Sequence, residues 1–565
     1  MIESSPSSKA VVTPQRFPDW LVPLGLSLFL SLLVILPFFW LGSASGHDFE
    51  FHVASWLDVS AQWREGILFP RWSEWTNHGF GEPRFIFYPP LSWILGAALV
   101  LLPGSAAPVA YIVLVQTFAG LFAYFLLRSL VNRRAAILAA GCYAINPNAL
   151  LMTYIRSDFA EQLACAFFPL LLLAALRLSN LLDESPPRRS SIAFFAVPYA
   201  TIWLSNAPAA VIASYSMALL FAWAAFSQRS WRPLLRASAA FALGLGLAAF
   251  YIIPAAYEQR WVNISQALSS GLLPVQNFLF TWINDAEHTW FNWIASICAL
   301  LLIVILALAA LFSRSLAQKS CNRPTGIALL ILGAAATLLT LRFTLPLWNY
   351  LPKLRFVQFP WRWMSIIALV AACFLAFAME RRRASLWFAA ILLLLAPLAY
   401  FQIQNTWWDD DDLPTMRDAL VNGQGFDGTD EYDPLGDDHL NLPAAAPPIK
   451  ILSPDSETES VSNAHFQIQR WSATQKQLRV DTPSEARVAL RLLNYPAWRV
   501  TVNGRTISPD RLDDINQMVV PVEPGTSEIA VDFTRTKDRT IGDAVSVASL
   551  LLTLFLLWIK PRPEN

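Results

Sequence analysis

The chain has 565 residues, of which 55% are hydrophobic and 15% are charged, and its 41 basic side chains balance 41 acidic ones. A soluble globular domain has about 25% charged residues, and a disordered chain has far fewer aliphatic and aromatic groups. The composition therefore predicts a membrane protein with many spans, and the zero net charge offers no basic surface for nucleic acid. The five cysteines form neither a C-x-x-C pair nor a zinc-type spacing, so redox chemistry and a disulfide framework are not expected.

Apolar runs mark the candidate membrane spans, because a helix needs about 20 residues to cross the hydrocarbon core. Ten long runs lie at 20–41, 109–127, 163–181, 207–226, 237–254, 291–312, 325–341, 363–379, 385–401 and 541–559, and two shorter ones at 135–150 and 191–204. A further run at 90–103 is too short for a full crossing and is predicted to dip into the outer leaflet. The first run could alternatively be a signal peptide cleaved near 43–45, but its apolar stretch exceeds the usual range of about 7 to 15 residues, which favours a membrane anchor.

Basic residues decide the orientation, because the cytoplasmic loops of membrane proteins are rich in Lys and Arg. When 90–103 does not cross, every basic cluster falls on one side of the membrane. These clusters contain Lys9, Arg16, Arg128, Arg133, Arg134, Arg188, Arg189, Arg229, Arg232, Arg236, Arg314, Lys319, Arg323, Arg381, Arg382, Arg383, Lys560 and Arg562. The sequence therefore predicts cytoplasmic tails at 1–19 and 560–565, a transmembrane domain at 20–401 with a first outer loop at 42–108, and a last span at 541–559.

The polar stretch 402–540 lies between the last two spans, on the outer side in this orientation. It begins with an acidic run from Asp409 to Asp412, which lacks the spacing of a calcium loop and is expected to be a charged linker. Later residues alternate with the period of a β-strand, and Asn503-Gly504 stands where a hairpin turn needs positive φ. We therefore expect a polytopic α-helical membrane protein of about 12 transmembrane helices, with an extracytoplasmic β-sandwich-like domain before the last helix.

Polar motifs gather in the outer loops, whereas the centres of the spans are almost uncharged. A secondary transporter places ionisable groups near the midplane, so this pattern favours a site at the outer interface. The first outer loop is the densest, with G-H-D-F-E-F-H at 46–52. Apolar residues at helical spacing predict an amphipathic helix at 53–67 that lies on the membrane surface with its tryptophan side in the membrane, which would hold Asp48 at the headgroup level. Asp48 is then either a general base for a hydroxyl acceptor or a solvated loop carboxylate.

Short motifs occur along the whole chain. They are H-D-F-E-F-H at 47–52, P-R-W at 70–72, G-F-G-E-P at 79–83, F-Y-P-P-L at 87–91, S-N-A-P at 205–208, F-P-W-R-W at 359–363 and N-Y-P-A-W at 494–498. In this order they resemble the bacterial membrane family labelled 6-pyruvoyl-tetrahydropterin-synthase-related, a label that should not be read as pterin chemistry. That family is similar to the GT-C glycosyltransferases, multi-span enzymes that move a sugar from a polyprenyl-phosphate carrier on the outer face of the membrane. The resemblance implies a GT-C-like fold for 20–401, a bacterial cytoplasmic membrane location, a polyprenyl-phosphate sugar donor, and a glycan or lipid acceptor.

The resemblance also implies roles for particular residues. The catalytic carboxylate of GT-C enzymes follows the first helix, which points to Asp48 and, second, to Glu50. Asp158 and Glu161 fit the place of a helping carboxylate in the second outer loop. Related sequences often have a histidine where this chain has Ser205, so the next residue is expected only to hydrogen-bond the substrate. Together, the expected substrate-binding residues are His47, His52, Arg71, Trp72, Tyr88 and Asn206.

A departing lipid phosphate needs cations at the outer headgroup level, preferably arginines, whose planar fork grips phosphate oxygens. Arg342, Lys353, Arg355 and Arg362 flank one outer loop, against the positive-inside trend. They are candidates for binding the donor phosphate or, alternatively, members of an interfacial belt that pairs with lipid headgroups. An enzyme of this kind requires Asp48 within about 15 Å of Arg355 and Arg362, because one donor must bridge them.

A divalent metal is a further option, because imidazole and carboxylate ligands suit Mn or Zn and carboxylates alone suit Mg. The candidate ligands on the outer face are His47, His52, His78, His288, Asp48 and Asp285. Their spacing is not diagnostic, and loop histidines are more often solvated than metal-bound. The sequence therefore leaves a Mg or Mn cofactor open.

Three functions are compatible with these features. A lipid or polysaccharide exporter would need a continuous polar cavity and intramembrane charges, of which the sequence has few. A non-catalytic scaffold for envelope assembly would not need Asp48 near the basic outer loop. The sequence favours a GT-C-type glycosyltransferase that moves a hexosyl or pentosyl group, in which one base and one activated donor allow an inverting displacement.

Overall fold

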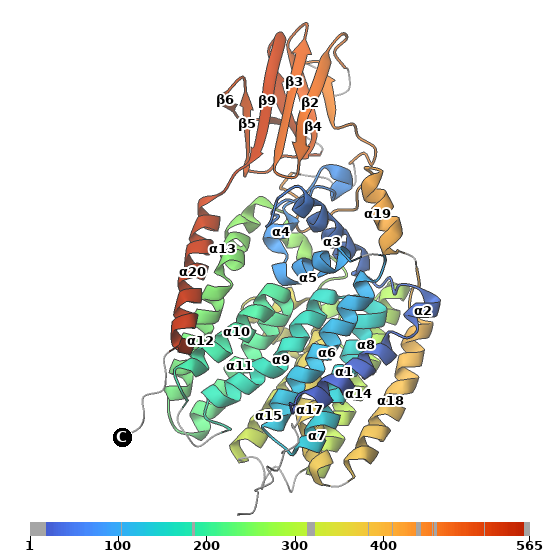
Figure 1. Ribbon diagram of the computed structural model, residues 1–565, viewed down its shortest axis with the longest axis vertical. Coiled ribbons are helices and arrows are strands. Elements are labelled where there is room, and N and C mark those ends of the chain that lie inside the picture. The colour runs from blue at the N-terminus through green and yellow to red at the C-terminus, as the bar shows by residue number, and fades with distance from the viewer. Residues whose placement is uncertain are drawn as a thin grey trace, which may run out of the picture.

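The computed structural model of the chain describes residues 18–558, apart from 103, 183–186, 314–322, 382, 410, 437–441, 455, 457–459 and 513–514. Three layers stack along the longest axis: a helical bundle, a middle layer made by the first outer loop, and a β domain (Figure 1). The chain is therefore a polytopic helical membrane protein with a C-terminal β domain. Most of the predicted tails at 1–19 and 560–565 lies outside the described residues.

Every predicted span contains a helix of the bundle, but the run at 191–204 forms a helix of only 16 residues, which is shorter than a candidate span. The bundle contains α1 (Leu21–Val34), α2 (Phe38–Leu41), α6 (Ala107–Arg128), α7 (Arg133–Ala144), α8 (Pro147–Leu151), α9 (Phe159–Leu178), α10 (Ser190–Ser205), α11 (Ala207–Ser227), α12 (Arg232–Leu247), α13 (Ala249–Glu258), α14 (Ala286–Ser313), α15 (Arg323–Leu339), α16 (Leu345–Tyr350), α17 (Met364–Arg381), α18 (Ala384–Gln404) and α20 (Lys537–Trp558). Among the described residues, nine helices are long and apolar enough to cross a membrane, or up to eleven if each of two bent pairs is one span. The bends are 76° between α12 and α13 and 92° between α15 and α16.

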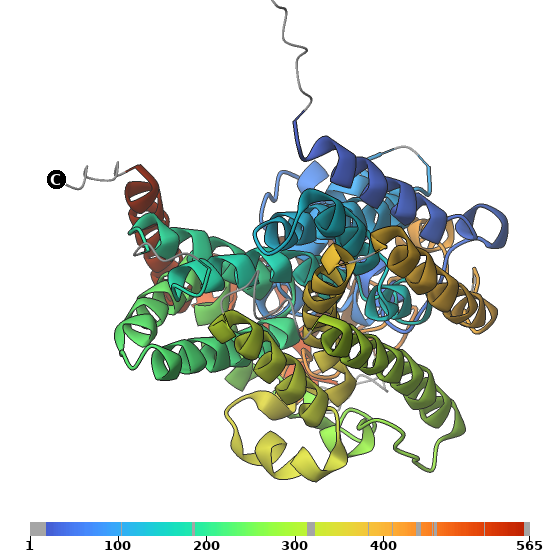
Figure 2. The same ribbon diagram turned by 90° about the horizontal axis from the view of Figure 1, so that it is seen from below.

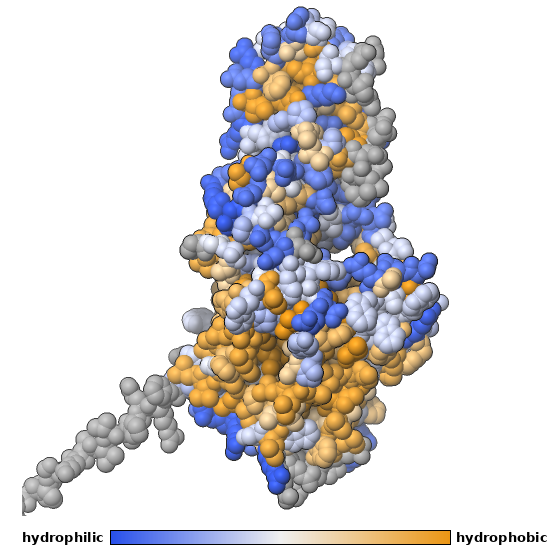
Figure 3. All heavy atoms as spheres, turned by 90° about the vertical axis from the view of Figure 1, so that its right-hand side faces the viewer, coloured by the Kyte–Doolittle hydropathy of each residue, from blue (hydrophilic) through white to orange (hydrophobic). Residues whose placement is uncertain are grey.

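The bundle has a buried centre and a lipid-facing periphery. In α17, 94% of the span is buried by other helices, whereas only 22% of α18 and 11% of α20 is buried. In the view from below, α18 and α20 lie at the outside (Figure 2). Both helices expose leucines, and the face of the bundle seen in Figure 3 carries an apolar belt with hydrophilic residues above and below it. This belt is the surface that a bilayer would cover.

The end of the bundle away from the β domain carries basic side chains. Arg133 pairs with Asp19 at 3.6 Å, and Arg134 donates a hydrogen bond to Ser385 at 2.8 Å. These contacts join the residues before α1, the start of α7 and the start of α18 at one end. Of the predicted basic clusters, Lys9, Arg16, Arg314, Lys319, Arg382, Lys560 and Arg562 lie outside the described residues.

The middle layer consists of α3 (Phe49–Arg64), α4 (Arg84–Phe87) and α5 (Pro90–Val100). The short α5 forms from the run that the sequence predicts not to cross. On α3, Trp56 is fully buried and stacks on Tyr111 with ring centroids 5.2 Å apart. The same indole lies on Gly96, where a Cβ atom would come within 2.1 Å of the ring. The prediction of a surface helix with its tryptophan side in the membrane is therefore wrong for Trp56, because that side packs on α5 and α6.

The β domain is a sandwich of two antiparallel sheets. Their strands are β1 (Ile449–Leu452), β2 (His465–Ser472), β3 (Gln475–Thr482), β4 (Ala486–Leu493), β5 (Trp498–Val502), β6 (Arg505–Ile507), β7 (Asp510–Leu512), β8 (Gln517–Val522) and β9 (Gly525–Phe533). The strand orders are β1-β4-β8-β7 and β2-β3-β9-β5-β6. Valine, leucine and isoleucine side chains of both sheets form one core. Asn503 and Gly504 have φ of +49° and +76° in the turn between β5 and β6, as the sequence predicts.

Polar contacts fix the β domain to the layers below it. Glu258, at the end of α13, accepts hydrogen bonds from Tyr495 of the β domain at 2.6 Å and from Arg539 of α20 at 2.7 Å. Lys476 of β3 donates to Glu74 of the first outer loop at 2.8 Å. The acidic run before the β domain belongs to this junction, since Asp412 caps α19 (Leu413–Val421), while Asp410 lies outside the described residues.

Candidate active site

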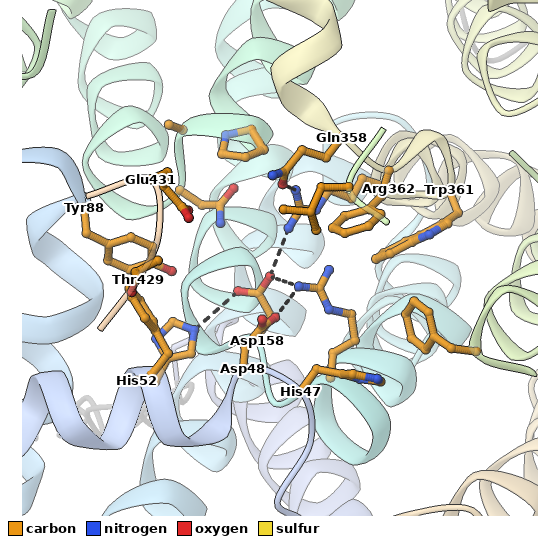
Figure 4. A pocket seen from close by; sticks show the side chains of 18 of the residues that line it. His47, Asp48, His52, Tyr88, Asp158, Gln358, Trp361, Arg362, Thr429 and Glu431 are labelled. Atoms are coloured by element: carbon orange, nitrogen blue, oxygen red, sulfur yellow. Dashed lines mark hydrogen bonds and ion pairs between the residues drawn. The ribbon is translucent and has the colours of Figure 1, made fainter. Parts of the chain in front are cut away.

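A cavity of about 540 Å³ opens where the bundle meets the middle layer and the linker before the β domain (Figure 4). Segments from six parts of the chain form its walls. The lining residues are His47, Asp48, Phe51, His52, Phe87, Tyr88, Pro89, Arg156, Asp158, Asn206, Ala207, Pro208, Leu272, Asp285, Glu287, His288, Phe291, Gln358, Phe359, Trp361, Arg362, Thr429, Glu431 and Tyr432. It is bounded by one end of the bundle, and Figure 1 shows this end facing the β domain.

Arg156 is the centre of the polar network in this cavity. Its Nη2 atom hydrogen-bonds the carboxylate of Asp48 and lies 3.2 Å from that of Asp158, and its Nη1 atom lies 3.9 Å from that of Glu161. The Arg156 side chain is only 5% exposed, whereas that of Asp48 is 32% exposed. One guanidinium therefore lies among three carboxylates, of which Asp48 is the most exposed.

A second arginine enters the network from another segment. Arg362 directs Nε to Glu161 at 2.9 Å and Nη2 to Asp158 at 3.7 Å. Its Nη1 atom donates to the backbone oxygen of Val357 at 3.0 Å. Asp48 and Arg362 thus line one cavity and are joined through Arg156 and Asp158, which meets the requirement set from the sequence for Arg362.

The backbone brings Asp48 and Arg156 together. The N–H of Asp48 donates to the oxygen of Arg156 at 2.9 Å, and the Ser157 hydroxyl accepts from the N–H of Gly46 at 3.0 Å and donates to the oxygen of Ala44 at 2.7 Å. A Cβ atom at position 46 would come within 2.4 Å of a backbone oxygen, so this crossing needs glycine. Ser157 has φ of +52°, and this turn separates the helical residues up to Arg156 from α9. The G-H-D and R-S-D segments are therefore two sides of one crossing.

Aromatic and imidazole groups surround the carboxylates. His52 places Nε2 3.7 Å from Asp158, and its ring lies edge-on to Tyr88 at 5.8 Å. Burial raises the pKa of Tyr88, with Asp158 adding to the shift, so its hydroxyl stays protonated. Burial also lowers the pKa of His47, whose ring lies between Phe291 and Trp407. His47 is therefore neutral at neutral pH.

Asp158 stays ionised in spite of its burial. Burial disfavours the carboxylate form, but Arg156, the hydrogen bond from His52 and then Arg362 outweigh that effect and hold the pKa of Asp158 well below its usual range. The Asp158 carboxylate also caps α9 by accepting from the N–H of Glu161 at 2.8 Å. Its position fixes both arginines and is itself fixed by the start of a helix.

The structure brings seven of the predicted site residues to the cavity wall and places the others elsewhere. Those on the wall are His47, Asp48, His52, Tyr88, Asp158, Asn206 and Arg362. The amide oxygen of Asn206 caps α11 by accepting from the N–H of Ala209 at 2.9 Å, and Glu161 lies behind the wall, paired with Arg362. Those that do not line the cavity are Glu50, Arg71, Trp72, Arg342, Lys353 and Arg355.

Each residue outside the cavity has a different environment. Arg342, Lys353 and Arg355 are exposed, and none of them faces Asp48 across the cavity, so the structure does not place them as predicted. Trp72 is 1% exposed and packs against aromatic rings of the β domain, so it is not available to stack on a sugar. Arg71 reaches the backbone oxygen of Phe250 at 3.4 Å, and burial lowers its pKa to about 10.

Glu50, the second catalytic carboxylate that the sequence predicts, does not line the cavity, although Asp48 and Phe51 on either side of it do. It is half-buried in the first turn of α3, next to the lining residue Phe51. Burial raises its pKa, and Asp411 and Asp427 add to that shift. Its carboxyl is therefore more easily protonated than a solvated one.

The sequence reasoning missed two groups of lining residues. Arg156 stands in the R-S-D-F-A-E motif but is not assigned a role there, although a buried arginine between acidic residues is a signal for an ion-pair network. Thr429, Glu431 and Tyr432 come from the linker before the β domain and have no sequence signal. Burial raises the pKa of Glu431 to about 7, and the nearby acidic groups of Glu82 and Asp430 add to it.

The residues of the cavity do not form the divalent metal site that the sequence leaves open. In the part of the chain that the structure describes, no group of three or more His, Cys, Asp or Glu side chains is arranged to hold a metal ion. Asp48 and Asp158 direct their oxygens at Arg156, and His288 hydrogen-bonds Asn277 at 2.7 Å. His78 lies near Asp427 at 3.4 Å, outside the cavity. A Mg or Mn ion would have to displace the guanidinium of Arg156.

Comparisons with known proteins give a family and a set of distant structures. No curated protein matches the chain. One solved structure that it resembles is the archaeal oligosaccharyltransferase AglB from Archaeoglobus fulgidus in complex with an inhibitory peptide and a dolichol-phosphate, at 17% identity and a TM-score of 0.39 over 68% of this chain and 55% of that chain. A second is the A. fulgidus oligosaccharyltransferase in complex with Zn and sulfate, at 19% identity and a TM-score of 0.40 over 67% of this chain and 52% of that chain. A third is the apo form of the A. fulgidus oligosaccharyltransferase, at 17% identity and a TM-score of 0.40 over 69% of this chain and 57% of that chain. The chain spans about half the length of these oligosaccharyltransferase chains. The family described as "6-pyruvoyl-tetrahydropterin synthase related domain; membrane protein" matches residues 85–406, which is more than half of the chain, and the protein belongs to that family.

Proposed function

We propose that the protein is a GT-C-type glycosyltransferase that moves a sugar from a polyprenyl-phosphate donor to an envelope acceptor, on the outer face of a bacterial cytoplasmic membrane. The observation that carries this proposal is the pairing of Asp48, open to the cavity, with the buried Arg156, which Asp158 joins to the buried Arg362 at one end of the bundle. The start of α7, which carries basic side chains, and the start of α18 lie at the other end and favour a cytoplasmic location for that end. The cavity and the β domain are then extracytoplasmic.

Asp48 is the proposed general base. Its carboxylate is partly exposed in the cavity, and Arg156 fixes its direction. The acceptor hydroxyl gives its proton to Asp48 while its oxygen forms a bond to the anomeric carbon of the sugar. The bond from that carbon to the phosphate oxygen breaks, and polyprenyl phosphate leaves with the electron pair. A single displacement of this kind inverts the anomeric centre.

Arg156 and Arg362 take the role of phosphate binders in place of the exposed cluster that the sequence suggests. Both guanidiniums are about 95% buried, and in such an environment a charge-assisted hydrogen bond to a phosphate oxygen is strong. Among the described residues, the buried Nη1 atom of Arg156 makes no hydrogen bond and lies 3.9 Å from the carboxylate of Glu161, so its charge is only loosely paired. Asp158 holds the two arginines close together between donor binding events.

A second cavity suggests where the lipid tail of the donor lies. It has a volume of about 510 Å³ and shares His47, Glu287 and Phe291 with the first cavity. Its other walls include Trp290 and Ile294 of α14 and residues that follow α18. Because α14 and α18 both belong to the membrane-spanning bundle, a polyprenyl chain can approach the arginines from the lipid side.

The proposal is tested with membranes that contain the protein, labelled polyprenyl-phosphate sugars and candidate envelope acceptors. Replacing Asp48→Asn should lower transfer about 10²- to 10⁴-fold, the usual contribution of a general base, with little change in the amount of folded protein. The matched control is Asp418→Asn, an exposed aspartate of α19 that lines neither cavity and should leave transfer unchanged. Undiminished transfer by the Asp48→Asn variant would exclude Asp48 as the base.

A further inference from the structure

A third cavity lies apart from the candidate active site, at the base of the β domain. It has a volume of about 540 Å³ and is lined by the N-Y-P-A-W motif, by Trp261 after α13, by Leu435 of the linker and by residues around β6 and β7. Figure 1 shows the tops of α13 and α20 below this part of the β domain. The proposed glycosyl transfer makes no use of this cavity or of its motif.

Part of the motif is used to build the cavity. Tyr495 donates to the buried carboxylate of Glu258 at 2.6 Å. The Trp498 ring packs edge-on against Trp72 at 5.3 Å. The amide of Asn516 donates to the backbone oxygen of Leu435 and to that of Asn494, both at 3.1 Å. These contacts fix the membrane domain, the linker and the β domain around one rigid hollow.

Other lining groups are not used by the fold. Among the described residues, the side chains of Asn494, Thr506 and Ser508 make no hydrogen bond, although all three line the cavity. Arg499 is 57% exposed and only loosely paired with Asp532, at 3.8 Å. Trp261 and Pro496 add apolar surface beside these polar groups. The cavity thus combines free amide and hydroxyl groups with an aromatic ring.

Arg499 supplies a positive charge to the lining that is only loosely paired, and no aspartate or glutamate lines the cavity among the described residues. An arginine fork binds a carboxylate in a bidentate way. The hydroxyl groups at the edge of a sugar hydrogen-bond amide and hydroxyl side chains, and the C–H groups on its face pack against aromatic rings. We propose that this cavity binds an acidic glycan, a chain that contains uronic acid residues.

The position of this cavity suggests that the bound glycan is the acceptor of the transferred sugar. This role rests on the proposed function. The linker that contributes Thr429, Glu431 and Tyr432 to the active-site cavity contributes Leu435 to this one. Three residues of extended chain span at most about 10 Å, so the two cavities are close along the linker. A glycan held at Trp261 is therefore near enough to present its growing end to Asp48 as the acceptor.

Binding is measured directly on the purified full-length protein in lipid nanodiscs. The probes are an oligogalacturonate of defined length, a neutral glucose oligomer of the same length and inorganic phosphate. The oligogalacturonate should bind, and the Arg499→Ala variant should bind it about tenfold more weakly, the loss of one charge-assisted contact. Arg505→Ala is the matched control, because Arg505 is an exposed arginine of the neighbouring strand that does not line the cavity. Its affinity should equal that of the unsubstituted protein.

Several outcomes would overturn the proposal. They are equal affinities of the Arg499→Ala and Arg505→Ala variants, equal binding of the neutral oligomer, and binding of phosphate without the glycan, which would indicate a lipid headgroup. If Arg499→Ala protein is unstable, Thr506→Val should weaken binding in its place without removing a charge. Asp48→Asn should leave binding intact. A protein that binds the glycan but transfers no sugar would leave the cavity assignment standing and remove only the acceptor role.

Discussion

This protein has two buried networks of arginines and carboxylates, one at the base of the β domain and one at the candidate active site. They differ in whether every charged atom has a partner inside the protein. At the base of the β domain, Glu258 accepts from Nε of Arg539 at 2.7 Å, from its Nη2 at 2.8 Å and from Tyr495 at 2.6 Å. Both carboxylate oxygens are satisfied, and both charged side chains are at most 4% exposed. Such a network holds structure together and has nothing left for a ligand.

The network at the candidate active site is incomplete by the same criterion. Arg156 is buried, yet one of its nitrogen atoms has no hydrogen-bond partner among the described residues, and Asp48 is 32% exposed in a cavity of about 540 Å³. A buried cation with a free donor next to an open carboxylate is costly for a purely structural element. The difference between the two networks therefore supports the proposed role of the open network in binding a charged substrate.

The largest expected effect comes from removing the central arginine of the open network. Arg156→Met should lower sugar transfer about 10³-fold, since it deletes a buried donor to the leaving phosphate and also frees Asp48 from its fixed direction. Arg156→Lys should recover part of the activity. The measurement is transfer per folded molecule, with the folded fraction taken from thermal unfolding in detergent.

The matched control for Arg156→Met is Arg539→Met, which removes an equally buried arginine from the closed network. It should lower stability and leave transfer per folded molecule unchanged. Equal losses of transfer in the two variants would erase the distinction between the networks.

The second effect concerns stability. Glu258→Gln removes the anion between Arg539 and Tyr495, and should lower the free energy of unfolding by about 4 kcal/mol, because a buried arginine is left unpaired. Tyr495→Phe, which deletes a single hydrogen bond, should cost only about 1 kcal/mol. Thermal unfolding and limited proteolysis measure both. Glu523→Gln, at an exposed glutamate of the same domain, should have no effect.

Much of the fold follows from local sequence patterns. Apolar runs locate the bundle because only an apolar helix can cross a bilayer, and Asn503-Gly504 locates a hairpin because few other pairs accept two positive φ values. The environment of α3 cannot be predicted from such local patterns. An apolar stripe that includes Trp56 has the same pattern whether it faces lipid or, as here, Tyr111 and Gly96 of neighbouring helices.

The candidate site also has a part that the sequence predicts and a part that depends on the folded chain. Asp48, Asp158 and Arg362 stand in short motifs, and their placement on one cavity agrees with the sequence reasoning. The pairing of Arg156 with Asp48 depends on a crossing of two segments about one hundred residues apart, which no local pattern encodes. Glu431 reaches the cavity from the linker that follows α18, so only the assembled layers reveal it.

Glu431 offers a smaller effect that depends on pH. Its pKa is raised to about 7 from 4.5, first because of burial, so the folded protein keeps a proton that the unfolded chain loses. The stability contributed by this group is complete below about pH 4.5 and is lost as the pH rises through about 7. Allowing for screening in the cavity, the loss is about 2 kcal/mol. Glu431→Gln should remove this pH dependence of thermal unfolding, and Glu523→Gln, at an exposed glutamate of the β domain, should retain it.

The smallest expected effect is that of a metal chelator. In the open network, the guanidinium of Arg156 lies between Asp48 and Asp158, where it supplies the positive charge that a bridging cation would otherwise supply. Transfer should therefore change by less than about twofold when EDTA is added, and added Mg or Mn should not increase it. In the Arg156→Met variant, the two carboxylates lose their common partner, and a divalent cation can then bind between them. Recovery of activity by Mn in that variant alone would show that a metal ion can supply the positive charge that Arg156 normally supplies. Inhibition of the unsubstituted protein by EDTA would contradict the role given to Arg156.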